Sequence, residues 1–133
     1  MAPSDLDVLR GRILVADDEP HIRRILISLF ESAAFSVDAV DSGTAAFACL
    51  EGETPYVMAV MDIMMPGATG LEVLHSLREL EHRTELPVVI LTAKGQDADR
   101  SAALDGGAQA FMTKPFSPKK LLARVDQIMA EAK

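Results

Sequence analysis

Cysteine is almost absent from this chain of 133 residues, which carries Cys49 alone. A single thiol excludes an intramolecular disulfide framework. Long apolar runs are also missing, because no segment approaches the roughly 20 consecutive apolar residues that cross a bilayer. The first apolar run, 13–16, is too short to be the core of a signal peptide. These absences predict a cytoplasmic protein that does not bind a membrane.

Positive charge is in deficit. The 13 Lys and Arg residues face 20 Asp and Glu residues, which gives a formal net charge of −7. This acidic balance argues against direct binding to nucleic acid or to an anionic membrane surface. Basic residues gather only at Arg23-Arg24 and at Lys119-Lys120 with Arg124. The solvated face of an amphipathic helix explains both groups better than a binding patch does.

The length and the 49% content of hydrophobic residues predict one domain with a sizeable core. The polar, proline-bearing residues 1–11 are expected to form a flexible lead-in, and residues 12–133 the folded domain. Cys49 lies in an apolar stretch, where a buried small side chain is expected rather than a reactive thiol.

Short apolar segments alternate with amphipathic ones along the domain. The apolar segments predict strands, and the spacing of apolar residues between them predicts helices. Ser42 and the pair Thr69 and Glu72 are expected to cap two of these helices. The strands are expected at 13–16, 35–40, 57–61, 88–91 and 108–112, and the helices begin near residues 20, 43, 70, 97 and 118.

This alternation predicts an α/β fold of the (βα)5 type, a doubly wound five-stranded parallel sheet with helices on both faces. In such sheets ligands bind beyond the carboxyl ends of the strands, near the point where the strand order reverses. The residues that follow each predicted strand are therefore the candidates for a functional site.

Ionisable and hydroxyl side chains stand at four of these strand ends. Asp17 and Asp18 follow the first strand, Asp62 ends the third, Thr92 ends the fourth and Lys114 follows the fifth. Each is ordinary alone, as a helix-start acid, a turn residue or a surface charge. Parallel strands bring them to one edge of the sheet, so they are expected to share a pocket.

Carboxylates that share a pocket repel one another unless a cation lies between them. A hard divalent cation prefers oxygen ligands, and Mg²⁺ takes only a few of them from protein. Asp18 and Asp62 could bind the ion directly, Asp17 through water, and a backbone carbonyl just after Asp62 could complete the protein ligands. Lys114 would offset the remaining negative charge and could hold an incoming anion. The pattern predicts a magnesium site around one reactive aspartate.

With these motifs in order, the sequence resembles the receiver domains of two-component response regulators, of the chemotaxis-regulator type. The resemblance runs from about Arg12 to the C-terminus. It implies a flavodoxin-like sheet with strand order 2-1-3-4-5. The matching motifs are Asp17-Asp18, Asp62-Ile63-Met64-Met65-Pro66-Gly67 with Gly70, Thr92-Ala93 and Lys114-Pro115.

The resemblance implies that Asp62 is the phosphoacceptor of a two-component system or phosphorelay. It would take a phosphoryl group from a histidine kinase or a histidine phosphotransfer protein. Asp17, Asp18, Asp62 and the backbone carbonyl of Met64 would hold Mg²⁺. The chain would be no enzyme for an outside substrate, but would catalyse its own phosphorylation and slow dephosphorylation.

The resemblance also implies how the phosphoryl group would be sensed. Lys114 would pair with one phosphoryl oxygen, Thr92 would move to hydrogen-bond another, and Phe111 would be the switch aromatic. The Lys114–Pro115 peptide bond is expected to be cis. The weakly apolar helix at 97–105, the last strand and the final helix would then bind an unknown downstream protein. Met64 and Lys94, which flank the pocket, are expected to tune the phosphoryl lifetime.

Three other functions are weighed against this one. A receiver-like binding module that is never phosphorylated would keep the fold and lose the chemistry. An aspartate-nucleophile phosphatase resembling the haloacid dehalogenase class needs two aspartates one residue apart, whereas Asp17 and Asp18 are adjacent. A flavin-binding domain needs a phosphate-cradling loop after the first strand, where the acidic residues would repel phosphate.

The sequence leaves the biological context open. The end of the chain soon after the final helix leads us to expect either a stand-alone receiver or a piece of a longer regulator. The cognate kinase, the downstream target and phosphorylation-dependent dimerisation are not specified by the sequence.

Overall fold

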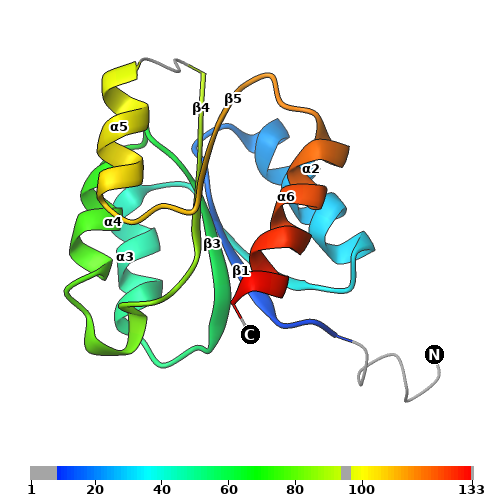
Figure 1. Ribbon diagram of the computed structural model, residues 1–133, viewed down its shortest axis with the longest axis horizontal. Helices are drawn as coiled ribbons and strands as arrows, with labels where there is room; N and C mark the ends of the chain where they lie inside the picture. The colour runs from blue at the N-terminus through cyan, green and yellow to red at the C-terminus, as the bar shows by residue number, and fades with distance from the viewer. Residues whose placement is uncertain (1–8, 94–96, 133) are drawn as a thin grey trace.

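The fold of the protein, in a computed structural model that describes residues 9–93 and 97–132, is a parallel sheet covered on both faces by helices (Figure 1). The five strands are hydrogen-bonded in the order β2-β1-β3-β4-β5. The predicted fold class and strand order are therefore confirmed. Within the described residues, no helix has the length and apolarity that crossing a membrane requires.

The strands are short and all parallel. The inner strands β1, β3 and β4 are almost entirely buried because helices cover both of their faces. The edge strand β2 is more exposed, in keeping with its alternating sequence. The bounds are β1 Arg12–Ala16, β2 Ser36–Val40, β3 Tyr56–Asp62, β4 Val88–Thr92 and β5 Ala110–Thr113.

Among the described residues, helices lie on both faces of the sheet (Figure 1). Helices α2 (Pro20–Ser32) and α6 (Pro118–Glu131) lie on the first face. The second face carries α3 (Gly43–Glu51), α4 (Gly70–Leu77) and α5 (Asp97–Asp105). A short 3-10 helix, η1 (Glu81–Arg83), lies between α4 and β4 and was not predicted from the sequence.

The predicted helix caps are present. The Ser42 side chain accepts a hydrogen bond from the Ala45 N–H at 3.0 Å. Thr69 and Glu72 form a capping box, in which each side chain accepts a hydrogen bond from the other residue's N–H. Such caps satisfy N–H groups that the helix itself leaves unpaired and contribute about 1 kcal/mol each. They fix where α3 and α4 begin, next to the carboxyl end of the sheet.

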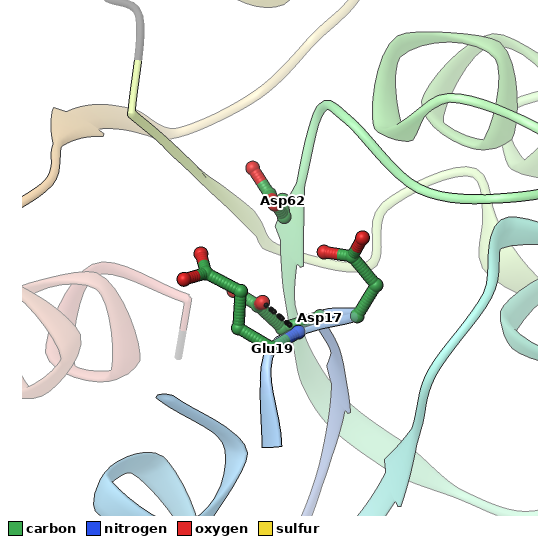
Figure 2. A group of neighbouring side chains, drawn as sticks. Asp17, Glu19 and Asp62 are labelled. Atoms are coloured by element: carbon green, nitrogen blue, oxygen red, sulfur yellow. Dashed lines mark hydrogen bonds between the residues drawn. The ribbon is translucent and has the colours of Figure 1, made fainter. Parts of the chain in front are cut away.

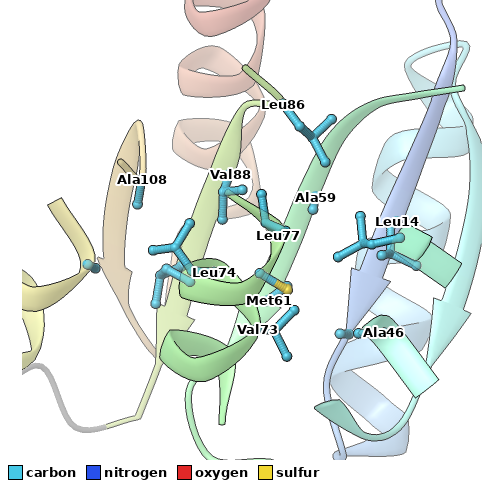
Figure 3. Packing of buried hydrophobic residues seen from close by; sticks show 14 of the residues in the cluster. Leu14, Ala46, Ala59, Met61, Val73, Leu74, Leu77, Leu86, Val88 and Ala108 are labelled. Atoms are coloured by element: carbon cyan, nitrogen blue, oxygen red, sulfur yellow. The ribbon is translucent and has the colours of Figure 1, made fainter. Parts of the chain in front are cut away.

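The protein has two hydrophobic cores, one on each side of the sheet, among the described residues. Alternate residues of β1 serve each core, because successive strand side chains point to opposite faces. Leu14 packs with the α3–α4 side, shown in Figure 3, and Ile13 and Val15 pack with the α2–α6 side. The strands that lead to the predicted site are thus buried in these two cores.

Some sequence-based expectations are only partly met. Ile25 follows the helical spacing of apolar residues in α2 but is 42% exposed, and the buried residues of that helix are Leu26 and Phe30. Cys49 is partly buried rather than fully buried. Among the basic residues, Arg23 donates to the backbone carbonyl of Asp17 at 2.8 Å, so it is not merely solvated.

Residues 1–8 of the predicted lead-in lie outside the described residues, whereas 9–11 are described. Arg10 is held by several partners. Its guanidinium pairs with Asp126 of α6 at 2.6 Å and lies 4.4 Å from the centre of the Phe35 ring. Its backbone N–H donates to the carbonyl of Ala34 at 2.8 Å. Arg10 therefore ties the start of the domain to α6 and to the turn before β2.

Arg83 is a buried charge that the sequence reading missed. Its side chain is almost fully enclosed, and the residue is 4% exposed. The guanidinium donates from Nε to the carbonyl of Leu50 at 2.9 Å and from Nη2 to the carbonyl of Gly52 at 3.0 Å. It also lies 5.3 Å from the centre of the Tyr56 ring. Arg83 thus fastens η1 to the end of α3.

Replacing Arg83 with methionine is expected to lower the free energy of unfolding by about 2 kcal/mol, because the buried carbonyl of Leu50 would lose its donor. Urea unfolding followed by circular dichroism measures the difference. Arg24→Met on the exposed face of α2 is the matched control and should change stability by less than about 0.5 kcal/mol. Equal stability of Arg83→Met and the wild type would show that the buried guanidinium does not stabilise this junction.

Candidate functional site

Four acidic side chains meet at the carboxyl end of the sheet. Asp17 follows β1 directly and Asp62 is the last residue of β3, so the pairing of these strands places the two carboxylates together (Figure 2). A carboxylate oxygen from each of Asp17, Asp18, Glu19 and Asp62 lies within 4.8 Å of the others. Asp17 and Asp62 are buried, Asp18 is exposed and Glu19 is half-buried. The predicted convergence of Asp17, Asp18 and Asp62 is confirmed.

Lys114 closes this pocket from the loop after β5. Its ammonium Nζ lies 2.7 Å from Asp17 Oδ2, 2.9 Å from Glu19 Oε1 and 3.3 Å from Asp62 Oδ2. Burial alone would lower the pKa of Lys114, but the hydrogen bonds to Asp17 and Glu19 outweigh it and raise this pKa to about 12. Lys114 is therefore a permanent positive charge in the pocket.

The backbone around Lys114 positions its side chain. Its N–H donates to the carbonyl of Thr92 at 2.7 Å, which joins the end of β5 to the end of β4. The Lys114–Pro115 peptide bond is cis, as the resemblance implied. Thr92 itself is 1% exposed and lies beside Thr113 in the β4–β5 register. Lys114 and Thr92 thus stand at the ends of neighbouring strands, at the same edge of the sheet as the acids.

The Asp62 carboxylate is buried, and its hydrogen bonding is incomplete within the described residues. Its Oδ1 atom is buried and, among the residues that the structure describes, has no hydrogen-bond partner. Burial raises the pKa of Asp62, the neighbouring Asp17 raises it further, and Lys114 only partly offsets both effects. A buried acceptor without a donor is costly and calls for a ligand or ion. Oδ1 is thus an oxygen that can bind a cation or attack an electrophile.

The donor set around Oδ1 fits Mg²⁺. It consists of carboxylate oxygens, which this ion prefers, and one of them is buried without a hydrogen-bond partner in the described part of the chain. Asp17 differs from the others because both of its oxygens already accept hydrogen bonds, Oδ1 from the Glu19 N–H at 2.9 Å, drawn as a dashed line in Figure 2, and Oδ2 from Lys114. Its geometry suits contact through water rather than direct ligation.

The loop after Asp62 requires the two glycines of its sequence motif. Gly67 has a φ of 83°, in the left-handed region that glycine tolerates. A Cβ on Gly70 would lie 2.2 Å from the Asp62 carbonyl oxygen, so only glycine lets α4 begin this close to β3. Met64 is 64% exposed beside the pocket, whereas Lys94 lies outside the described residues. The two glycines therefore allow this loop to lie close to α3 and to the end of β3.

Phe111 lies on β5 and is 6% exposed. The guanidinium of Arg100 on α5 stands 5.3 Å from the centre of its ring. The ring also belongs to the core formed by α3, α4 and α5. The predicted switch residue is therefore in contact with the helix that was expected to respond to phosphorylation.

Glu19 was not singled out by the sequence analysis, although it pairs with Lys114 as closely as the aspartates do. The only signal was its place in the acidic run after β1. A glutamate at that position also serves as an ordinary helix-start residue, since it is the N-cap of α2. Its role depends on where Lys114 lies, which the local sequence does not give.

Comparisons with known proteins agree with this geometry. The sequence profile of the family described as "Response regulator receiver domain" matches residues 13–126. The chain is 37% identical to the transcriptional regulatory protein ResD of Bacillus subtilis over 122 residues, covering 91% of this chain and 49% of ResD. It is 42% identical to the transcriptional regulatory protein TcrA of Mycobacterium tuberculosis over 114 residues, covering 86% of this chain and 44% of TcrA.

The chain thus spans about half the length of these curated relatives. Among solved structures, it is similar to the receiver domain of the Francisella response regulator 1452, with a TM-score of 0.83 and 30% sequence identity. That match covers 92% of this chain and 98% of the Francisella chain. Similarity of sequence and of fold therefore extends over nearly the whole described domain.

Proposed function

The chain belongs to the response regulator receiver domain family, and we propose that it is a signalling switch controlled by phosphorylation of Asp62. One observation carries the choice of Asp62. Its buried Oδ1 has no hydrogen-bond partner among the described residues, while its Oδ2 lies 3.3 Å from the Lys114 ammonium. One carboxylate oxygen is free to react and a positive charge stands beside it.

In the proposed reaction, a carboxylate oxygen of Asp62 attacks the phosphorus of a phosphohistidine on a histidine kinase or histidine phosphotransfer protein. The P–N bond breaks, its electron pair stays on the ring nitrogen, and an acyl phosphate forms on Asp62. Water later attacks the phosphorus, the bond from phosphorus to the Asp62 carboxylate oxygen breaks, inorganic phosphate is released and the carboxylate is restored. Phosphoryl transfer needs mainly positioning and charge neutralisation, which a pocket of this kind provides.

Receiver domains generally bind Mg²⁺, and in this chain Asp17, Asp18, Asp62 and the backbone carbonyl of Met64 would hold it. When bound, the ion would neutralise charge on the phosphoryl oxygens. Asp17 would act through water, because both of its oxygens already accept hydrogen bonds. Lys114 would neutralise the opposite side of the phosphoryl group, since its Nζ already lies beside Asp62.

The phosphoryl group would bring about two negative charges into the pocket. Lys114 would pair with one of its oxygens, and the Thr92 hydroxyl would donate to another after moving toward it. Both residues are joined through the Lys114 N–H to Thr92 carbonyl hydrogen bond, so their movement would shift the ends of β4 and β5 together. Phe111 and Arg100, which are in contact, would pass the shift to α5.

The output surface proposed for a downstream protein is formed by α5, β5 and α6. It contains a hollow of about 380 Å³ between these elements, lined in part by Arg100, Phe111 and Arg124. Leu104, which also lines it, is 44% exposed. Phosphorylation is expected to shift the backbone NMR signals of this surface. Signals that stay fixed while Asp62 is phosphorylated would exclude it as the output.

The proposal is tested by incubating the metal-free chain with acetyl phosphate, with and without Mg²⁺, and measuring the intact mass over time. We expect a mass increase of one phosphoryl group only in the presence of Mg²⁺, on the peptide that contains Asp62. Wild-type protein that gains no phosphoryl group from acetyl phosphate or from any phosphohistidine donor would favour the never-phosphorylated binding module. Repeated turnover of a phosphate ester would favour the phosphatase.

A further inference from the structure

Glu19 is a partner of Lys114 that the mechanism above does not use. An ammonium group has three N–H donors. In the structure the Lys114 ammonium faces three carboxylates, at 2.7 Å from Asp17, 2.9 Å from Glu19 and 3.3 Å from Asp62. Every donor therefore has an acceptor already. A phosphoryl oxygen can pair with Lys114 only if one carboxylate gives up its place.

The three carboxylates differ in how much it costs to release them. The Asp17 side chain is 1% exposed and that of Asp62 is 6% exposed, whereas the Glu19 side chain is 44% exposed. A buried carboxylate that loses its ammonium partner stays desolvated, which is strongly unfavourable. A half-exposed carboxylate is hydrated instead, so breaking its ion pair costs little. Glu19 is the partner that leaves most easily.

Glu19 is also placed to leave without disturbing the core. It is the residue just before α2, and its backbone N–H donates to Asp17 Oδ1 (Figure 2). That backbone hydrogen bond can stay while the side chain rotates into water. The second carboxylate oxygen, Oε2, lies 3.9 Å from Nε2 of the exposed His21, at the rim of the pocket. Apart from the ion pair to Lys114, movement of the Glu19 side chain therefore changes, among the described contacts, only the one to His21 at the surface.

We propose that Glu19 is a positioning residue. Its carboxylate holds the Lys114 ammonium by taking the place that a phosphoryl oxygen will occupy, and it leaves when the phosphoryl group arrives. This inference rests on the proposed function of Asp62. No covalent bond changes in the exchange: the Glu19 Oε1 to Lys114 Nζ ion pair breaks, and an ion pair from a phosphoryl oxygen to Nζ replaces it. Glu19 thereby keeps the Lys114 ammonium directed into the pocket and delays its pairing with the phosphoryl group.

The exchange predicts a specific split between two rates. The pair of Glu19 and Lys114 exists before phosphotransfer and is lost as the phosphoryl group arrives, so removing it should speed phosphorylation. Once Asp62 is phosphorylated, Glu19 has already left, so the decay of the acyl phosphate should not change. A partly exposed ion pair of this kind corresponds to about a two- to fivefold effect.

Two substitutions of Glu19 separate its geometry from its charge. Glu19→Gln keeps the shape and removes the charge, whereas Glu19→Asp keeps the charge and shortens the reach by one methylene. If Glu19 acts through its contact with Lys114, both variants should speed phosphorylation. If Glu19 merely repels the incoming anion, only Glu19→Gln should do so. Asp41→Asn, at the exposed end of β2, removes a charge from the same edge of the sheet and is the matched control.

The experiment follows the intact mass of the wild type and these three variants with acetyl phosphate and Mg²⁺, and then the decay after the donor is removed. Mg²⁺ affinity is measured separately by calorimetry without donor. We expect both Glu19 variants to be phosphorylated about two- to fivefold faster, with decay rates and Mg²⁺ affinities within about twofold of the wild type. Asp41→Asn should match the wild type in all three measurements.

Several results would overturn the inference. One is a phosphorylation rate of Glu19→Gln equal to that of the wild type, and another is Glu19→Asp behaving as the wild type does. A tenfold loss of Mg²⁺ affinity in Glu19→Gln would instead make Glu19 a metal ligand. In each of these cases phosphorylation of Asp62 would stand. A wild type that accepts no phosphoryl group would remove both the proposed function and this inference.

Discussion

Asp62→Asn is expected to take up no detectable phosphoryl group under conditions that phosphorylate the wild type. The substitution keeps the shape of the side chain but replaces the carboxylate with an amide, whose oxygen is a poor nucleophile. It also removes a negative charge from the acidic group around Lys114. Intact mass after incubation with acetyl phosphate and Mg²⁺ measures the effect, and peptide mapping locates any modified residue.

Asp41→Asn is the control for Asp62→Asn, because it also removes one carboxylate from the carboxyl end of the sheet and leaves the buried site intact. It should be phosphorylated as the wild type is. Undiminished phosphorylation of Asp62→Asn would show that another residue accepts the phosphoryl group. The assignment of Asp62 would then be wrong, even if the chain still signalled by phosphorylation.

The raised pKa of Asp62 predicts that the effect of Asp62→Asn on stability depends on pH. Because the pKa of Asp62 is raised in the folded state, the folded chain holds a proton on this group more readily than the unfolded chain does. The charged Asp62 therefore destabilises the fold near neutral pH, and this penalty disappears as the pH falls through the raised pKa. Without metal, Asp62→Asn should be more stable than the wild type at pH 7, and the difference should shrink on acidification. A difference that grows on acidification would contradict the raised pKa.

Lys114→Met is expected to lower the free energy of unfolding of the metal-free protein by about 3 kcal/mol. The loss of one member of a buried ion pair leaves the other charge unpaired, which is strongly destabilising. Here the ammonium faces three carboxylates, and two of them, Asp17 and Asp62, are buried. Urea unfolding in the presence of a chelator measures the loss. Mg²⁺ should restore part of the stability, since it supplies positive charge to the same acids.

Phosphorylation of Lys114→Met by acetyl phosphate should also be slower, by about 100-fold, the usual effect of removing a preorganised group that stabilises developing charge. Lys119→Met, in the exposed first turn of α6, is the matched control and should change neither quantity appreciably. Equal stability of Lys114→Met and the wild type in the chelator would contradict the electrostatic description of the pocket. Equal phosphorylation rates would mean that Lys114 does not contact the phosphoryl group.

Much of this architecture could be predicted because it depends on local sequence patterns. The buried run that ends at Thr92 and the Thr69–Glu72 capping box each depend on residues within a few positions of one another. The convergence of Asp17, Asp62 and Lys114 followed from the parallel sheet, because a regular fold converts strand ends into neighbours. The family resemblance added the strand order, which the local patterns do not determine.

The features that were missed depend on tertiary contacts. Ile25 follows the helical spacing of α2, but it lies about 100° around the helix from the buried Leu26 and so faces partly outward. Arg83 reads as a surface residue until its partners, the carbonyls at the end of α3, are known. Glu19 likewise gains its role only from the position of Lys114. The local sequence around a charged residue does not reveal which buried groups surround its side chain in the fold.

Titration of Mg²⁺ into the metal-free chain in a calorimeter shows whether the acidic pocket binds the ion. The described pocket, with its clustered carboxylates and unpartnered Asp62 Oδ1, predicts one Mg²⁺ bound per chain in the wild type. The double variant Asp18→Asn and Asp62→Asn should show no such binding. A wild type that binds no Mg²⁺, or a double variant that binds it equally well, would show that this pocket is not a magnesium site.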